Sequence, residues 1–204
     1  MSYLEYTVKT VPSGWRKVLY LNWPLIILLT AVACVGFLML YSVAGGSLQP
    51  WAEPQMERFG LGLAAMFITA MVPIWLWRNL SALIYLVALA LLVAVELFGA
   101  VGMGAQRWID LGFMRLQPSE LMKISLVMAL AAYYDWLPMK RVSRPIWVIA
   151  PLILILAPTF LTLTQPDLGT AILLMTAGGL MMFLAGVHWA YFAVVIAAAG
   201  GGIY

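Results

Sequence analysis

Apolar residues fall in long runs along this chain, and short polar stretches separate the runs. A helix that crosses the hydrocarbon core of a bilayer needs about 20 mostly apolar residues. Seven runs meet or approach this length: Pro24–Val43, Phe59–Trp77, Leu80–Val101, Pro118–Tyr134, Pro145–Leu163, Leu168–Ala185 and Trp189–Tyr204. The pattern predicts an all-α polytopic membrane protein, with an N-terminal segment over residues 1–23 and a transmembrane helical domain over residues 24–204.

The two ends of this pattern carry separate expectations. The first run is longer than the roughly 7–15 apolar residues of a signal peptide, so we expect a retained span and not a cleaved leader. The seventh run is still apolar at Tyr204, with no flanking charge. We therefore expect the transmembrane domain to be truncated at this end, as in a fragment of a longer protein.

Composition excludes several classes of protein. Apolar residues make up 65% of the 204 positions and charged residues 9%, whereas soluble domains carry about 25% charged residues. The formal charge of +3 comes from scattered basic residues, so it gives no indication of nucleic-acid binding. A single cysteine, Cys34, rules out a disulfide within the chain, and no metal-ligand pattern is present. A single histidine, His188, argues against Cys-His and Ser-His-Asp catalysis.

The basic residues predict the orientation of the helices, because Lys and Arg are enriched in cytoplasmic loops. One set of alternate loops holds Lys9, Arg16, Lys17, Arg78, Lys140, Arg141 and Arg144. The opposite set holds Arg58, Arg107, Arg115 and Lys123. Seven basic residues against four predict a cytoplasmic N-terminus.

With this topology, seven ionisable residues of mixed sign fall at one depth on the non-cytoplasmic side: Glu96, Arg107, Asp110, Arg115, Glu120, Lys123 and Asp167. Ionisable groups inside a membrane are costly, and they usually pair or line a cavity. The sequence therefore predicts a polar cavity that opens toward the outer leaflet.

The first motif of interest is Gln117–Lys123, with the sequence Gln-Pro-Ser-Glu-Leu-Met-Lys. Pro118 suits the first position of a helix, and Glu120 suits the first turn, where the helix dipole favours an anion. Glu120 and Lys123 are three residues apart and share a face. Two interpretations remain open: an ordinary helix start with a neutralising pair, or a charged pair that faces a polar cavity and binds phosphate through Lys123.

Two further motifs lie on the same predicted side. The segment Gln165–Thr170 repeats the order Gln, Pro, acid at the start of an apolar helix, and Asp167 is placed to satisfy free N–H groups there. The segment Gly104–Gly112 is predicted to be a short interfacial loop or re-entrant segment, with Trp108 at headgroup depth. Arg107 either clamps a phosphate or carboxylate or pairs with Asp110.

These motifs, in this order, resemble the SEDS family, the shape, elongation, division and sporulation proteins of bacteria. They are Gly-Ala-Gln-Arg-Trp over residues 104–108, Gln-Pro-Ser-Glu-Leu with Lys123 over residues 117–123, and Gln-Pro-Asp-Leu-Gly over residues 165–169. The runs Arg-Trp-Ile-Asp-Leu-Gly and Asp-Leu-Gly-Thr look more like the rod-shape (RodA) branch than the division (FtsW) branch.

The resemblance implies a membrane fold of about ten helices and a peptidoglycan glycosyltransferase that polymerises lipid II at the periplasmic face of the bacterial inner membrane. It implies a class B penicillin-binding protein as partner, within the elongation complex, and a divalent cation, Mg or Mn, with ligands unknown. Glu120, Lys123 and Asp167 match family positions implicated in function, and Arg107, Trp108 and Gln117 belong to the same motifs. The family's catalytic aspartate lies in a loop after the seventh span, so we expect this 204-residue chain to be inactive alone.

Two alternatives to the enzyme remain open. A lipid II flippase needs polar residues at several depths, and the inner halves of the predicted spans are apolar. A non-catalytic membrane scaffold of the elongation machinery needs no cavity.

Overall fold

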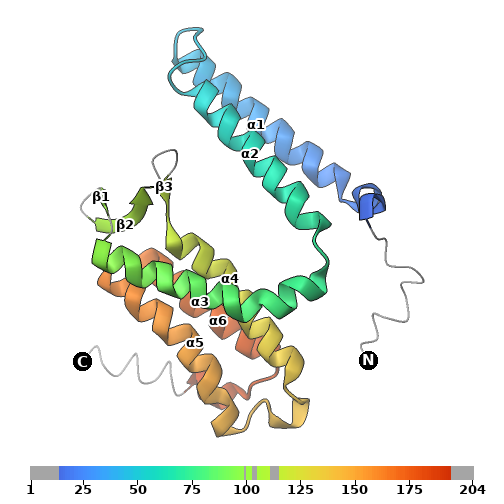
Figure 1. The fold of residues 1–204 in the computed structure, drawn as a ribbon, viewed down its shortest axis with the longest axis vertical. Helices are drawn as coiled ribbons and strands as arrows, with labels where there is room; N and C mark the ends of the chain where they lie inside the picture. Colours follow the sequence, from blue (N-terminus) through green and yellow to red (C-terminus); the bar gives the residue numbers. More distant parts are fainter. Residues whose placement is uncertain (1–13, 99, 103–104, 111–114, 194–204) are drawn as a thin grey trace. The chain divides into compact units, whose positions relative to one another are not determined.

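The computed structural model describes residues 14–98, 100–102, 105–110 and 115–193. The chain divides into two compact units, Met1–Ile74 and Trp75–Tyr204, and each is described by itself. The N-terminal unit holds the 3-10 helix η2 (Gly14–Tyr20) and the helices α1 (Trp23–Val43) and α2 (Ala52–Met71). The remaining helices and a small sheet belong to the second unit (Figure 1).

Helices α1 and α2 form an antiparallel hairpin (Figure 1). Two aromatic contacts join the helices. The ring centroids of Phe37 and Phe59 are 5.7 Å apart, and those of Trp23 and Phe67 are 6.1 Å apart. Helix α1 starts where local chemistry dictates, because the Asn22 side chain accepts a hydrogen bond from the Leu25 N–H, 3.2 Å away.

The second unit is built from α3 (Ile74–Phe98), α4 (Pro118–Trp136), α5 (Pro145–Thr164) and α6 (Leu168–Leu184). Helices α4, α5 and α6 pack against one another. A 3-10 turn, η3 (Met139–Arg141), lies between α4 and α5. The centre of the bundle is filled by side chains that are fully buried: Leu92, Met122, Leu126, Leu130 and Leu174.

Two prolines inside α5 are matched by tyrosines on neighbouring helices. Pro158 and Pro151 have no N–H to donate to the carbonyls four residues earlier, at Leu154 and Trp147. The Tyr85 hydroxyl of α3 donates to the Leu154 carbonyl oxygen at 2.9 Å, and the Tyr133 hydroxyl of α4 donates to the Trp147 oxygen at 2.7 Å. Each carbonyl that a proline deprives of its partner is thus satisfied from another helix, as an apolar surrounding requires.

The outer faces of the helices are apolar. Along α5, Ile146, Ile153 and Phe160 recur every seven residues and are 61–72% exposed, while Val148 and Ile155 on the opposite face are buried. Among the described helices, three are long and apolar enough to cross a membrane: Trp23–Val43, Ile74–Leu97 and Pro145–Thr164. Exposed apolar stripes on helices of this length show an integral membrane protein, because lipid is the solvent that such a surface fits.

The predicted helices match the structure best at their prolines, and the second and third spans required correction. The second was predicted over Phe59–Trp77, but α2 is Ala52–Met71. Its first turns carry the charged residues Glu53 and Arg58. A prediction from hydropathy leaves charged residues out of a span, although the helix itself continues beyond the apolar run. Pro73 separates α2 from α3, because the residue before a proline, here Val72, takes an extended backbone.

Gly104–Gly112 was predicted to be a short interfacial loop or re-entrant segment, and its described residues, Ala105–Asp110, form a β-strand. The third span was predicted to reach Val101, but α3 ends at Phe98 and a three-stranded antiparallel sheet follows it. Its strands are β1 (Ala100–Gly102), β2 (Ala105–Asp110) and β3 (Arg115–Leu116). Of the seventh predicted span, residues 189–193 are helical, and the rest lies outside the described residues.

Candidate functional site

One end of the second unit brings together the segments that the sequence singled out. The C-terminal ends of α3 and α5, the N-terminal ends of α4 and α6, and the sheet all lie at this end (Figure 1). Strand β2 contacts α4, and the side chains of Thr164, the last residue of α5, and of Gln165, which follows it, reach the last turns of α3. We call this the motif end of the unit.

Glu120 and Lys123 form an ion pair at the start of α4. The Lys123 ammonium nitrogen lies 2.8 Å from each carboxylate oxygen of Glu120. The Lys123 side chain is 29% exposed and that of Glu120 is 57% exposed, so the pair is open on one side. The local sequence favours a helix start at this point. Gln117 is extended, Pro118 follows as the first helical residue, and the Glu120 N–H donates to the Gln117 carbonyl oxygen at 3.1 Å. The arrangement holds a cation at a fixed place, where it is able to meet an anion.

Asp167 caps α6. One of its carboxylate oxygens accepts from the Thr170 N–H at 3.2 Å, and the other accepts from the Thr170 hydroxyl at 2.8 Å. The sequence predicted that Asp167 satisfies free N–H groups, and this capping is confirmed. Thr170, for which no polar role was predicted, holds the carboxylate in place. The signal for this role was a Thr three residues after an acid at the N-cap.

Gln165 and Thr164 fasten the end of α5 to α3. The Gln165 side chain is 4% exposed, and its amide nitrogen donates to the Leu92 carbonyl oxygen at 3.0 Å. The Thr164 hydroxyl lies 3.3 Å from a carboxylate oxygen of Glu96. Glu96, which the sequence placed in the outer part of the third span, therefore lies against the turn that carries Asp167. No local pattern predicted either contact, because each joins residues about 70 positions apart in the chain.

The sheet carries the Arg-Trp motif. Ala100 pairs with Trp108 between β1 and β2, and Asp110 pairs with Arg115 between β2 and β3. Trp108 is half-buried. The side chains of Arg107, Asp110 and Arg115 lie outside the described part of the structure, so the choice between a phosphate clamp and an internal ion pair stays open.

Ser119, for which no role was predicted, is buried next to the Glu120–Lys123 ion pair in the sequence. Its side chain is 2% exposed, and its hydroxyl has no hydrogen-bond partner within the described part of the chain. It stands between Pro118 and Glu120, at the start of α4.

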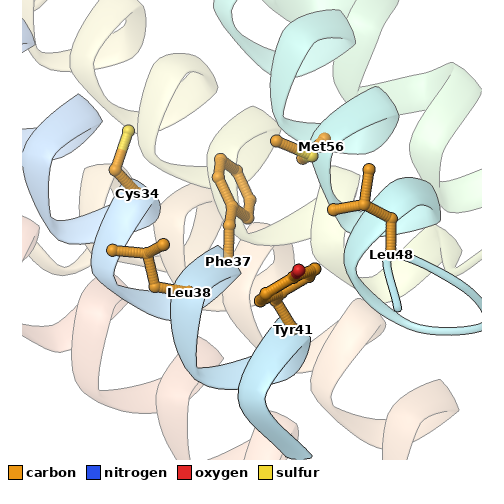
Figure 2. Close-up of a pocket in the computed structure, with 6 residues that line it drawn as sticks. All are labelled: Cys34, Phe37, Leu38, Tyr41, Leu48 and Met56. Atoms are coloured by element: carbon orange, nitrogen blue, oxygen red, sulfur yellow. The ribbon is translucent and has the colours of Figure 1, made fainter. Parts of the chain in front are cut away.

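A groove in the N-terminal unit offers a contrast to the motif end. It has a volume of about 400 Å³, and Figure 2 shows its lining. Phe37 and Tyr41 of α1 face Met56 of α2 there, and the other lining residues are Cys34, Leu38 and Leu48. This lining is almost wholly apolar, and it includes no carboxylate, histidine, lysine or arginine.

The described residues also bear on metal binding. No three His, Cys, Asp or Glu side chains within them lie close enough together to hold a metal ion.

Comparison with known proteins gives consistent matches along most of the chain. The family model for FtsW, RodA and SpoVE, described as cell cycle protein, matches residues 22–203. The peptidoglycan glycosyltransferase MrdB of Escherichia coli (strain K12) is 35% identical over 184 residues, which are 89% of this chain and 48% of MrdB. The chain thus spans about half the length of the curated relatives it matches.

Two solved structures share the fold. The Thermus thermophilus rod shape determining protein RodA superposes with a TM-score of 0.74 at 30% identity, covering 87% of this chain and 57% of that chain. A chain of a peptidoglycan synthase complex, solved to show how polymerization and crosslinking are coordinated, gives a TM-score of 0.76 at 30% identity. It covers 88% of this chain and 52% of that chain.

Proposed function

Since this chain belongs to the family of FtsW, RodA and SpoVE cell cycle proteins, we propose that it takes part in peptidoglycan glycosyl transfer. The proposed reaction polymerises lipid II into glycan strands during cell-wall elongation. The named activity of the MrdB relative and the likeness to RodA support this proposal and favour the rod-shape branch.

The observation that carries the proposal is the open ion pair at the motif end. As the new glycosidic bond forms, undecaprenyl pyrophosphate departs from the donor sugar. Negative charge develops on this leaving group, so a nearby cation stabilises the transition state. Lys123 supplies a compact cation, and Glu120 fixes its position at 2.8 Å. We assign Lys123 to the pyrophosphate, Glu120 to positioning Lys123, and Asp167 to capping α6 at the same end of the unit.

Arg107, Trp108 and Gln117 complete the proposed substrate-binding set. A guanidinium binds two phosphate oxygens at once, and Trp108 is half-buried at the sheet, where an amphipathic ring suits the membrane interface. We assign no general base to the described residues.

The proposal includes a cation, a partner and a location. A Mg or Mn ion is proposed to accompany the pyrophosphate, although the described residues supply no ligand set for it. A class B penicillin-binding protein is the proposed partner within the elongation complex, supported by the likeness to a chain of a peptidoglycan synthase complex. The proposed location is the bacterial inner membrane, and the bias of basic residues supports a cytoplasmic N-terminus with the motif end facing the periplasm.

The test uses a chimera, because the chain matches about half of MrdB. Residues 22–203 replace the matching part of Escherichia coli MrdB, and the chimera is produced in cells depleted of MrdB. We expect restored rod shape, and purified chimera with its penicillin-binding partner should polymerise labelled lipid II into glycan visible on a gel.

The variant Lys123→Ala in this chimera should lower the polymerisation rate by about 100-fold or more, as loss of one electrostatic stabiliser does. The control is Asp135→Asn, an exposed carboxylate at the other end of α4, which should leave the rate unchanged. Polymerisation by Lys123→Ala at the parental rate would remove Lys123 from the site. If the chimera reached normal levels in the membrane and bound its partner but made no polymer, the proposed glycosyltransferase activity would be refuted. That result would favour the non-catalytic scaffold.

A further inference from the structure

Three cations stand at the end of the second unit that is opposite the motif end. Lys140, Arg141 and Arg144 lie between α4 and α5, and all three are exposed. No carboxylate pairs with them among the residues that the structure describes. The nearest acid along the chain, Asp135, is paired with Arg78 at 2.7 Å. The three positive charges are therefore uncompensated by this part of the protein.

The backbone that carries these cations is fixed. The Arg141 N–H donates to the Pro138 oxygen at 2.8 Å, and the Arg144 N–H donates to the Arg141 oxygen at 3.0 Å. Val142, between them, is 3% exposed. The Ser143 hydroxyl donates to the Gly186 oxygen at 3.1 Å and accepts from the backbone N–H of the turn after α6 at 3.0 Å. The cations are thus presented outward as a set with a defined arrangement.

Aromatic rings place this set at the depth of lipid headgroups. The Arg141 guanidinium lies over the Trp147 ring, 5.7 Å from its centroid, and the Trp147 and Trp136 rings are 5.8 Å apart. Trp136 is 63% exposed, and Ile146 beside the cations is 72% exposed. Exposed tryptophans at the ends of membrane-spanning helices sit at the membrane–water interface, so apolar chains meet Ile146 while the cations meet headgroups.

We propose that Lys140, Arg141 and Arg144 form a binding site for the headgroup of an anionic membrane phospholipid, of the phosphatidylglycerol type. The phosphodiester binds the three cations, and the acyl chains lie along the exposed face of α5. A lipid is favoured over a free phosphate or a soluble partner because the cations adjoin interfacial tryptophans and exposed apolar side chains. The site does not depend on the proposed glycosyl transfer, since it lies at the other end of the helices.

The experiment is native mass spectrometry of the protein released from mixed micelles that contain phosphatidylglycerol and phosphatidylcholine with identical acyl chains. We expect phosphatidylglycerol to be retained in preference to phosphatidylcholine. The variant Arg141→Gln should weaken phosphatidylglycerol retention about fivefold, the effect of one basic residue near an anionic surface, and the triple glutamine variant at 140, 141 and 144 should abolish the preference. Arg58→Gln, the same loss of charge at an exposed position of α2, is the matched control and should change nothing.

Each other outcome overturns the proposal. Equal retention of both lipids excludes an anionic site. Equal losses in Arg141→Gln and Arg58→Gln mean a diffuse response to net charge. Displacement of the lipid by a few millimolar sodium phosphate means that the cations bind phosphate without a lipid. Because all substituted side chains are exposed, the variants should fold, and the single variants decide the question if the triple variant does not.

Discussion

The tyrosine–proline pairs of α5 give a prediction that tests the packing of the second unit. Tyr85→Phe removes only the hydroxyl that donates to the Leu154 oxygen at 2.9 Å. The ring stays in place in a position that is 5% exposed. Since Pro158 has no N–H, the substitution leaves the Leu154 carbonyl without its donor in an apolar surrounding.

The expected magnitude follows from the surroundings. Hydrogen bonds between helices in membranes contribute on average about 0.6 kcal/mol and at most about 1.7 kcal/mol. An orphaned buried acceptor costs about 1–3 kcal/mol in soluble proteins. We expect Tyr85→Phe to lower the free energy of unfolding by about 1–2 kcal/mol.

A second substitution isolates the cause. In Pro158→Ala the alanine N–H is able to bond the Leu154 oxygen within α5, so Tyr85→Phe should then cost less than about 0.5 kcal/mol, well below an orphaned acceptor. The other pair supplies the control. Tyr133→Phe should be compensated by Pro151→Ala and not by Pro158→Ala, because the Tyr133 hydroxyl serves the carbonyl that Pro151 affects.

The assay is reversible unfolding in mixed micelles, followed by tryptophan fluorescence, for the single and double variants of both pairs. The double-mutant cycle yields the coupling free energy, which should be about 1 kcal/mol within each pair and near zero across pairs. A Tyr85→Phe cost that is the same with Pro158 and with alanine would refute the idea that the tyrosine serves the proline-deprived carbonyl.

Two further predictions concern α6, one at Gly178 inside the helix and one at its N-cap, Asp167. Gly178→Ala should destabilise the protein by about 1–3 kcal/mol relative to Gly179→Ala, because a Cβ at Gly178 would lie 2.7 Å from the Ile155 Cδ1 while a Cβ at Gly179 meets nothing within 4 Å. Both variants gain the same helix propensity, so this gain cancels when their thermal unfolding is compared. Equal stabilities of the two variants would contradict the packing. Asp167→Asn should impair rod shape in the chimera more than Asp135→Asn, because Asp167 accepts two hydrogen bonds at the start of α6. The Asp135 ion pair is 58% exposed and contributes at most about 1 kcal/mol. Equal growth and cell shape of the two variants would contradict this prediction.

Local signals determined much of the fold. Pro118 and Pro145 mark the first residues of α4 and α5, and Asp167 directly precedes α6, as predicted. These starts depend on which N–H groups are free in a first turn, a property of neighbouring residues. The ion pair of Glu120 and Lys123 is local in the same way, since residues three apart share a helix face.

The pattern of apolar and polar residues did not predict contacts between residues that are far apart in the sequence. The sheet arises from pairing of β1 with β2 and of β2 with β3, and these short strands carry too few alternating positions to be distinguished from a loop by pattern alone. The burial of Gln165 against Leu92 depends on α3, which lies far away in the sequence. Both features position the motif end, so the candidate site was identified by its residues and not by its geometry.

The sequence by itself determined that helices cross a membrane, because length and hydropathy depend only on consecutive residues. It did not determine which face of each helix packs inward, since lipid and protein core are both apolar. On α5 the outward Ile153 and the inward Ile155 are equally hydrophobic. Only the tertiary structure decided between them, through close contact at Gly178 and through hydroxyls that meet carbonyls left free by prolines.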